Sequence, residues 1–145
     1  MIYTSYWGKL KELVKKFGKD KIICVSRYQR FWNGKRCSLL YPSKELLKGF
    51  KEGKITEEDY TKIFRKYLDS LNVDDCYKTL DGCILVCYEK TGFCHRHIIS
   101  KWLRENGYQC WEYWNLLTLD RGSFFLAIPT DIKFNFLFVD GWRGC

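Results

Sequence analysis

The chain has 145 residues, of which 46% are hydrophobic and 18% aromatic, so it can bury a core and is neither a disordered nor a low-complexity protein. Its net charge of +8 is uneven, because residues 1 to 66 hold 17 Lys and Arg against 7 Asp and Glu, while residues 67 to 145 hold 8 against 10. A basic half attracts anionic partners, of which nucleotides and nucleic acids are the usual ones, although a solvated lysine-rich face gives the same count.

Membrane insertion and export are not predicted. The longest apolar runs, such as Ile84 to Cys87 and Phe136 to Val139, are far shorter than the about 18 residues that a membrane helix needs. The first residues also lack the basic and then apolar segments of a secretory signal. We therefore expect a cytoplasmic protein without a membrane partner, whose eight cysteines are reduced thiols rather than disulfides.

The beginning of the sequence has the pattern of a strand, a helix and a second strand. Ile2 to Ser5 predicts a short strand. From Leu10 to Phe17 the apolar residues recur at helical spacing, and Gly18 provides a C-terminal stop. Lys21 to Ser26 is a continuous apolar run bounded by polar residues, which is typical of a strand covered on both faces.

The middle of the sequence predicts a long loop and two helices. Arg27 to Tyr41 alternates basic and aromatic residues without a regular period, which indicates a functional or covering loop. Ser43 can cap a short helix that Gly53 ends. Thr56 can cap a longer helix whose apolar stripe extends to Leu71, and packing in the core is by far the best explanation of that stripe.

A further strand-helix-strand pattern follows. Cys83 to Tyr88 predicts a buried strand, Cys94 to Asn106 a helix ended by Gly107, and Tyr108 to Tyr113 another strand. Strands that alternate with helices pair in parallel through right-handed crossovers. We therefore predict an α/β fold over residues 1 to 114, a Rossmann-like three-layer sandwich with a mostly parallel central sheet.

Residues 115 to 145 have a different pattern. Ser123 to Ile128 and Lys133 to Val139 predict two strands, joined by Pro129 to Asp131. We expect this segment to be a C-terminal β-hairpin extension packed on the same domain.

Ligands of an open parallel sheet bind beyond the carboxyl ends of its strands, so the residues that follow the strands are candidates for a site. The residues expected to surround a ligand at this end of the sheet, as its rim, include Ser5, Tyr6, Arg27, Arg30 and Glu112.

The most chemically distinctive residues surround the start of the last predicted helix. A loop at residues 89 to 93 enters this helix, which has Cys94, His95 and Arg96 in its first turn. Free backbone N–H groups at a helix start attract anions, so we expect Lys90, Gly92 and Arg96 to bind the anionic group of a substrate. The same positive field is expected to lower the pKa of Cys94, whose thiolate could act as a nucleophile or a metal ligand.

Two further side chains could supply acid-base chemistry. Helical spacing places His95 on the inner face of its helix and His97 on the solvated face. An imidazolium is disfavoured at the positive end of a helix, so His95 could be a neutral base, or else a packed structural residue. Glu89 could orient His95 or act as a general base, although a plain ion pair with Arg96 or Lys90 fits its position equally well.

Zinc is the less favoured alternative at this site. Cys87, Cys94 and His95 offer soft ligands, but their spacing matches no common zinc motif. We therefore expect no cofactor.

The run from Ile84 to Leu103 resembles the signature of the domain of unknown function 488 family, in which a strand ending in Cys-x-Glu is followed by Cys-His-Arg. Ile2 to Tyr6 and Leu40 to Ser43 are also similar to segments of that family. The resemblance covers about residues 1 to 114 and implies an α/β sandwich of Rossmann-like layering. The site residues that it implies, without naming a reaction, are Cys87, Glu89, Cys94, His95 and Arg96.

We therefore expect an enzyme, a hydrolase or a transferase, that acts on a nucleotide, nucleoside or nucleic-acid-linked anionic substrate through Cys94, His95 and Glu89. Two alternatives fit the same sequence. The first is a nucleic-acid-binding module without catalysis, with phosphates bound by Arg27, Arg30, Lys35 and Arg36 and bases stacked on Tyr28, Phe31 and Trp32. The second is a zinc-stabilised interaction protein.

Overall fold

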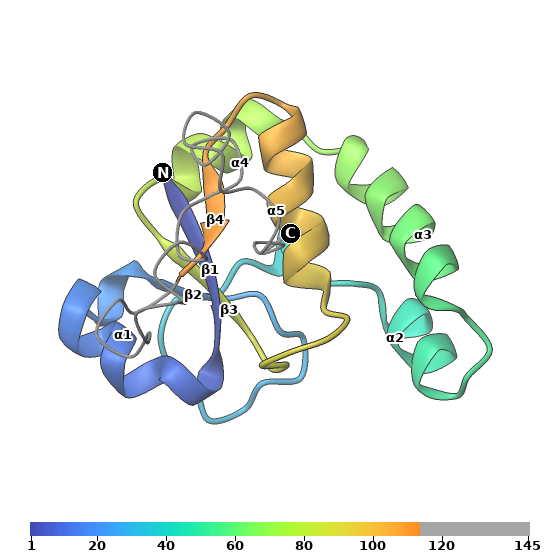
Figure 1. Cartoon of the computed structure of the whole chain (residues 1–145), viewed down its shortest axis with the longest axis horizontal. Helices are drawn as coiled ribbons and strands as arrows, with labels where there is room; N and C mark the ends of the chain where they lie inside the picture. Colours follow the sequence, from blue (N-terminus) through green and yellow to red (C-terminus); the bar gives the residue numbers. More distant parts are fainter. Residues whose placement is uncertain (114–145) are drawn as a thin grey trace, which may run out of the picture.

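The computed structural model describes residues 1 to 113, which form four strands and five α-helices (Figure 1). The strands are β1 (Ile2–Tyr6), β2 (Ile22–Cys24), β3 (Ile84–Cys87) and β4 (Cys110–Glu112). The α-helices are α1 (Leu10–Phe17), α2 (Lys44–Lys51), α3 (Glu57–Asp69), α4 (Val73–Leu80) and α5 (His95–Glu105). Short 3₁₀ helices cover Trp7–Lys9, Lys19–Lys21 and Ser38–Leu40.

The strands form one parallel sheet in the order β2-β3-β1-β4, and Tyr3 of β1 pairs with Ile84 on one side and Trp111 on the other. The chain crosses the sheet in one direction from β1 to β2 and in the opposite direction from β2 to β3 and from β3 to β4. Right-handed crossovers therefore place α1 on one face and α2 to α5 on the other. Figure 1 shows α1 apart from α5 and α3, with the sheet between them.

The side chains of the strands alternate between two cores, one on each face of the sheet. On β3, Ile84 and Val86 join the core that contains Leu13 of α1. Leu85 and Cys87 join the larger core, to which α2 to α5 contribute. All four residues of β3 are buried, which explains why the strand is a continuous apolar run. The alternation also points Cys87 toward the side of α5.

The predicted α/β sandwich with a parallel sheet is confirmed for the described residues, and its Rossmann-like character stays a prediction. Strands β2, β3 and β4 are shorter than the runs that predicted them, whereas β1 extends one residue beyond its prediction, to Tyr6. Helix α4 was not predicted, because only Cys76 and Leu80 on it are buried and its apolar pattern is correspondingly short. Its start is nevertheless clear, since the Asn72 side chain accepts a hydrogen bond of 3.1 Å from the Asp75 N–H.

The predicted C-terminal hairpin, Ser123 to Ile128 and Lys133 to Val139, lies outside the described residues. Within residues 1 to 113, no helix has the length and apolar character that crossing a membrane requires.

Candidate functional site

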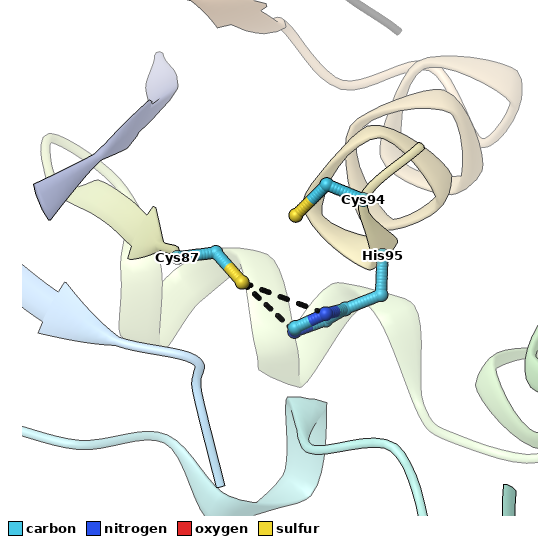
Figure 2. A group of neighbouring side chains, drawn as sticks. All are labelled: Cys87, Cys94 and His95. Atoms are coloured by element: carbon cyan, nitrogen blue, oxygen red, sulfur yellow. Dashed lines mark hydrogen bonds between the residues drawn. The ribbon is translucent and has the colours of Figure 1, made fainter. Parts of the chain in front are cut away.

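The carboxyl end of β3 and the start of α5 bring three metal-binding or nucleophilic side chains together. Cys87 is the last residue of β3, Cys94 is the N-cap of α5 and His95 is its first residue. Figure 2 shows the two sulfur atoms and the imidazole ring facing one space between the strand and the helix. The two Sγ atoms and the nearer ring nitrogen all lie within 4.8 Å of one another. All three residues are buried, so the cluster is held by packing.

The imidazole of His95 is held by a backbone carbonyl from another strand. Its Nε2 lies 2.7 Å from the carbonyl oxygen of Val25, just beyond the end of β2. Because a carbonyl oxygen can only accept, Nε2 carries the hydrogen, and in the neutral ring Nδ1 then has the free lone pair. Nδ1 lies 3.6 Å from the Cys87 Sγ, and the edge of the ring packs against Phe64 of α3. His95 therefore faces inward, as helical spacing predicted.

The pKa values of the two thiols are shifted in opposite directions. A hydrogen bond with Cys87, together with burial, raises the pKa of the Cys94 thiol. The same hydrogen bond from Cys94 lowers the pKa of the Cys87 thiol. The prediction that the helix start lowers the pKa of Cys94 is therefore wrong, because two adjacent buried thiols share one proton more readily than both lose theirs. Cys87 is therefore the more acidic thiol of the pair.

Arg96 has a structural position rather than an open anion-binding one. Its side chain is 1% exposed, and its Nε and Nη2 donate to the Glu112 carboxylate at 3.2 and 3.1 Å. Nη1 donates to the Glu89 carbonyl oxygen, and Nη2 also donates to that of Lys90 at 3.4 Å. The Thr4 hydroxyl donates to Glu112 Oε2 at 2.6 Å, the oxygen that also accepts from the Arg96 Nε. The guanidinium thus joins β4 to the loop after β3, which does not fit the predicted contact with a substrate anion.

The loop between β3 and α5 contains the other predicted site residues. The Glu89 carboxylate lies 3.9 Å from the Cys87 Sγ, so it borders the cluster from the solvent side. Lys90 is exposed. Gly92 has a φ of 82°, which a residue with a side chain rarely adopts, and this turn leads the chain into α5. Glu89 is therefore close enough to act at the cluster, whereas no contact described in residues 1 to 113 places Lys90 there.

A cavity of about 500 Å³ opens beside the cluster, between α3 and α5. Cys94 lines it and connects it to the cluster. The other lining residues are Glu57, Thr61, Arg65, Gly92, Phe93, His97, Ile98 and Lys101. This volume suits a small organic ligand. The contribution of α3 was missed, because its apolar stripe indicates only core packing.

His97 was predicted to be solvated, and this is wrong. Its side chain is 27% exposed, it lines the cavity, and its Nε2 lies 3.8 Å from Glu112. Burial and the nearby Arg96 lower the pKa of His97 to about 4. His97 is therefore neutral at physiological pH.

The predicted rim residues are not gathered at the cluster. Ser5 is fully buried. Tyr6 is half-buried, with the Lys9 ammonium 6.0 Å from its ring. The Arg27 Nε donates to the carbonyl oxygen of Pro42, and Arg30 is exposed. Glu112 alone of the rim contacts the site, through Arg96.

Two contacts of the site could not be predicted. The Val25 carbonyl that orients His95 carries no signal in the sequence, because every residue has such a group. Thr4 lies within a strand, where a threonine usually only packs.

Comparisons with family models, curated proteins and solved structures find no match to this chain. The resemblance of residues 84 to 103 to the domain of unknown function 488 family stays a prediction.

Proposed function

We propose that this protein is a zinc-dependent enzyme in which Cys87, Cys94 and His95 hold the ion, and that it hydrolyses a nucleotide, nucleoside or nucleic-acid-linked anionic substrate. The observation that carries the proposal is the convergence of three ligand atoms within 4.8 Å in a buried space. Two thiols and an imidazole are the ligands that zinc prefers. The proposal reverses the expectation from spacing alone, which disfavoured zinc.

The distances support a tetrahedral ion. Zinc lies about 2.3 Å from thiolate sulfur and about 2.0 to 2.1 Å from imidazole nitrogen, so a tetrahedral angle separates the two ligand atoms by about 3.5 to 3.6 Å. The Cys87 Sγ and the His95 Nδ1 are 3.6 Å apart. The pairs that include the Cys94 Sγ lie within 4.8 Å, so they would close by up to about 1 Å on binding.

The hydrogen bond of His95 supports the same assignment. A histidine that ligates a metal through one nitrogen usually donates the other N–H to a carbonyl or a carboxylate, which fixes its orientation. The Nε2–H of His95 makes this bond to Val25. The lowered pKa of Cys87 further favours a thiolate ligand.

Three protein ligands are typical of a catalytic rather than a structural zinc site. Bound zinc would supply Lewis-acid activation of water or of a substrate oxygen at its remaining position. Glu89, 3.9 Å from the Cys87 Sγ, is the carboxylate placed to accept a proton beside the cluster. The adjoining cavity gives a substrate access to Cys94.

Two cations, Arg65 and Lys101, line the cavity beside Glu57, and both are paired with carboxylates, Arg65 with Asp69 and Glu105 and Lys101 with Glu105. The support for an anionic substrate is therefore the first turn of α5, which contains no acidic residue. The start of α5 adds free N–H groups and the positive end of the helix dipole. An anionic group, such as a phosphate ester, is therefore the substrate moiety that fits.

Metal analysis tests the first half of the proposal. Protein purified without chelator is expected to contain about one zinc per chain, and Cys87→Ser, Cys94→Ser and His95→Gln are each expected to reduce this content by 10-fold or more, since each removes a ligand. Cobalt substitution should give a thiolate charge-transfer band that the same variants lose. Cys76→Ser is the matched control, because Cys76 is buried outside the cluster. Equal metal content in all four variants would contradict the assignment.

Turnover tests the second half. A library of nucleotides, phosphate esters and oligonucleotides is incubated with the zinc-loaded protein, with the chelator-treated protein and with Glu89→Gln. We expect zinc-dependent hydrolysis that Glu89→Gln slows without loss of zinc. Bound zinc without hydrolysis of any substrate would make the ion structural and the protein a zinc-stabilised interaction protein. Hydrolysis that survives complete zinc removal would instead indicate a metal-free thiol enzyme.

A further inference from the structure

The loop of residues 25 to 37 is rigid although it contains no regular helix. The side chain of Trp32 is buried. Its backbone N–H donates to Gln29 Oε1 at 3.0 Å, and its indole Nε1 donates to the Lys35 carbonyl oxygen at 3.0 Å. The Arg36 Nη2 donates to the Gln29 carbonyl oxygen at 2.7 Å and also to that of Trp32. A loop held in this way presents a preformed surface.

This surface exposes aromatic rings. Phe31 is 63% exposed and Tyr28 is 56% exposed. Phe31 is not loose, because its ring packs edge-on against Trp7 at 5.2 Å between centroids. Exposed aromatic side chains on an ordered loop are costly to leave in water and are typical of a binding surface.

The cations around these rings divide into two groups. Arg36 is occupied by backbone carbonyls of the loop, and Arg27 donates to the Pro42 carbonyl oxygen. Arg30 and Lys35 are exposed and have no acidic partner among residues 1 to 113. Two of the four cations that the sequence suggested for phosphate binding therefore stay available.

The charge and the position of the loop identify the partner. Residues 1 to 43 hold 10 Lys and Arg against 2 Asp and Glu, so the partner is anionic. Exposed aromatic rings between cations match a chain that alternates phosphates with unpaired bases, whereas the bases of a duplex are already stacked. The loop begins at Val25, whose carbonyl oxygen contacts His95, and continues to Phe31, which packs against Trp7 in the core on the α1 face, so only the start of the loop borders the cluster.

We propose that single-stranded nucleic acid binds on this loop, with bases stacked on Tyr28 and Phe31 and phosphates held by Arg30 and Lys35. The inference rests on the proposed function for the role of the cluster, and it narrows the substrate class to single-stranded nucleic acid.

Fluorescence anisotropy with a labelled 12-nucleotide single strand tests this binding without using turnover, so loss of binding and loss of hydrolysis are separate results. Tyr28→Leu with Phe31→Leu keeps apolar contact with Trp7 but removes the aromatic faces, and is expected to weaken binding by about 30-fold or more, since two stacked bases are lost. Arg30→Gln with Lys35→Gln should make the slope of log K against log salt shallower by about 1.4, since each lost contact contributes about 0.7.

The control double variant is Lys66→Gln with Lys78→Gln, which removes the same charge from exposed positions on α3 and α4. It should bind almost as tightly as the unchanged protein. Circular dichroism verifies that each variant is folded. The inference is overturned if the leucine variant binds as tightly as the unchanged protein, if the control loses as much affinity as the Arg30 and Lys35 variant, or if a duplex of equal length or anionic vesicles bind more tightly than the single strand.

Discussion

The buried pair of Arg96 and Glu112 allows a sharp test of how the site is held. Arg96→Met removes a guanidinium that is 1% exposed, and it leaves the Glu112 carboxylate 8% exposed with Thr4 as its remaining close donor. The carbonyl oxygens of Glu89 and Lys90 also lose their donor. Removing one partner of a buried ion pair costs about 3 to 5 kcal/mol, because the other charge stays buried without compensation.

The free energy of unfolding is measured by urea denaturation followed by circular dichroism. For a chain of this length, each kcal/mol lost from the free energy of unfolding also lowers the melting temperature by about 2 to 4 °C. Arg96→Met should therefore lower the melting temperature by roughly 6 to 20 °C. Arg96→Lys keeps the charge but loses the planar fork, and it should cost less than Arg96→Met. The double variant Arg96→Met with Glu112→Leu should cost less than the two single changes together, since no charge is then left unpaired.

One result would refute this reasoning. If Arg96→Met left the urea midpoint unchanged but abolished substrate binding, the guanidinium would serve the substrate anion, as the sequence suggested, and the ion pair with Glu112 would be dispensable. If Arg96→Met instead lowers the stability but retains its zinc content at low temperature, Arg96 acts by holding the site in position.

Four further substitutions, one of them a control, test the packing and the helix ends of the fold, each measured by the urea midpoint. Leu68→Ala should lower the free energy of unfolding by about 2 to 5 kcal/mol, because Leu68 is fully buried on α3. Ile63→Ala on the same helix should lower it far less, because that side chain is 49% exposed. Equal losses of stability would contradict the orientation of α3. Asn72→Ala should cost about 1 kcal/mol, because it removes the cap of α4; no loss would mean that α4 does not begin there. Gly107→Ala should cost about 1 to 2 kcal/mol, because its φ of 90° disfavours any side chain; a more stable variant would contradict this backbone conformation.

The fold could largely be predicted from local patterns. The apolar runs at residues 21 to 26 and 83 to 88 predicted buried strands, and the stripe after Thr56 predicted a long helix, because burial on two faces or on one face leaves different periods in a sequence. Helix α4 was missed for the same reason, since two buried residues are too few to show a period. Strand ends were predicted less well, because they depend on where the neighbouring strand stops.

The sequence by itself determined which residue types could act, and it placed Cys94, His95 and Glu89 near one end of the sheet because strand ends and helix starts follow from local pattern. Only the tertiary structure decided which atoms meet. The carbonyl oxygen that orients His95 comes from a residue 70 positions away, and Thr4 reaches Glu112 across 108 positions. Such contacts arise when β2 and β1 pair on either side of β3 and β4 pairs with β1, and no local period encodes them. Packing also buried the two thiols side by side, which made Cys87 rather than Cys94 the more acidic thiol and brought zinc from the less favoured alternative to the proposed cofactor.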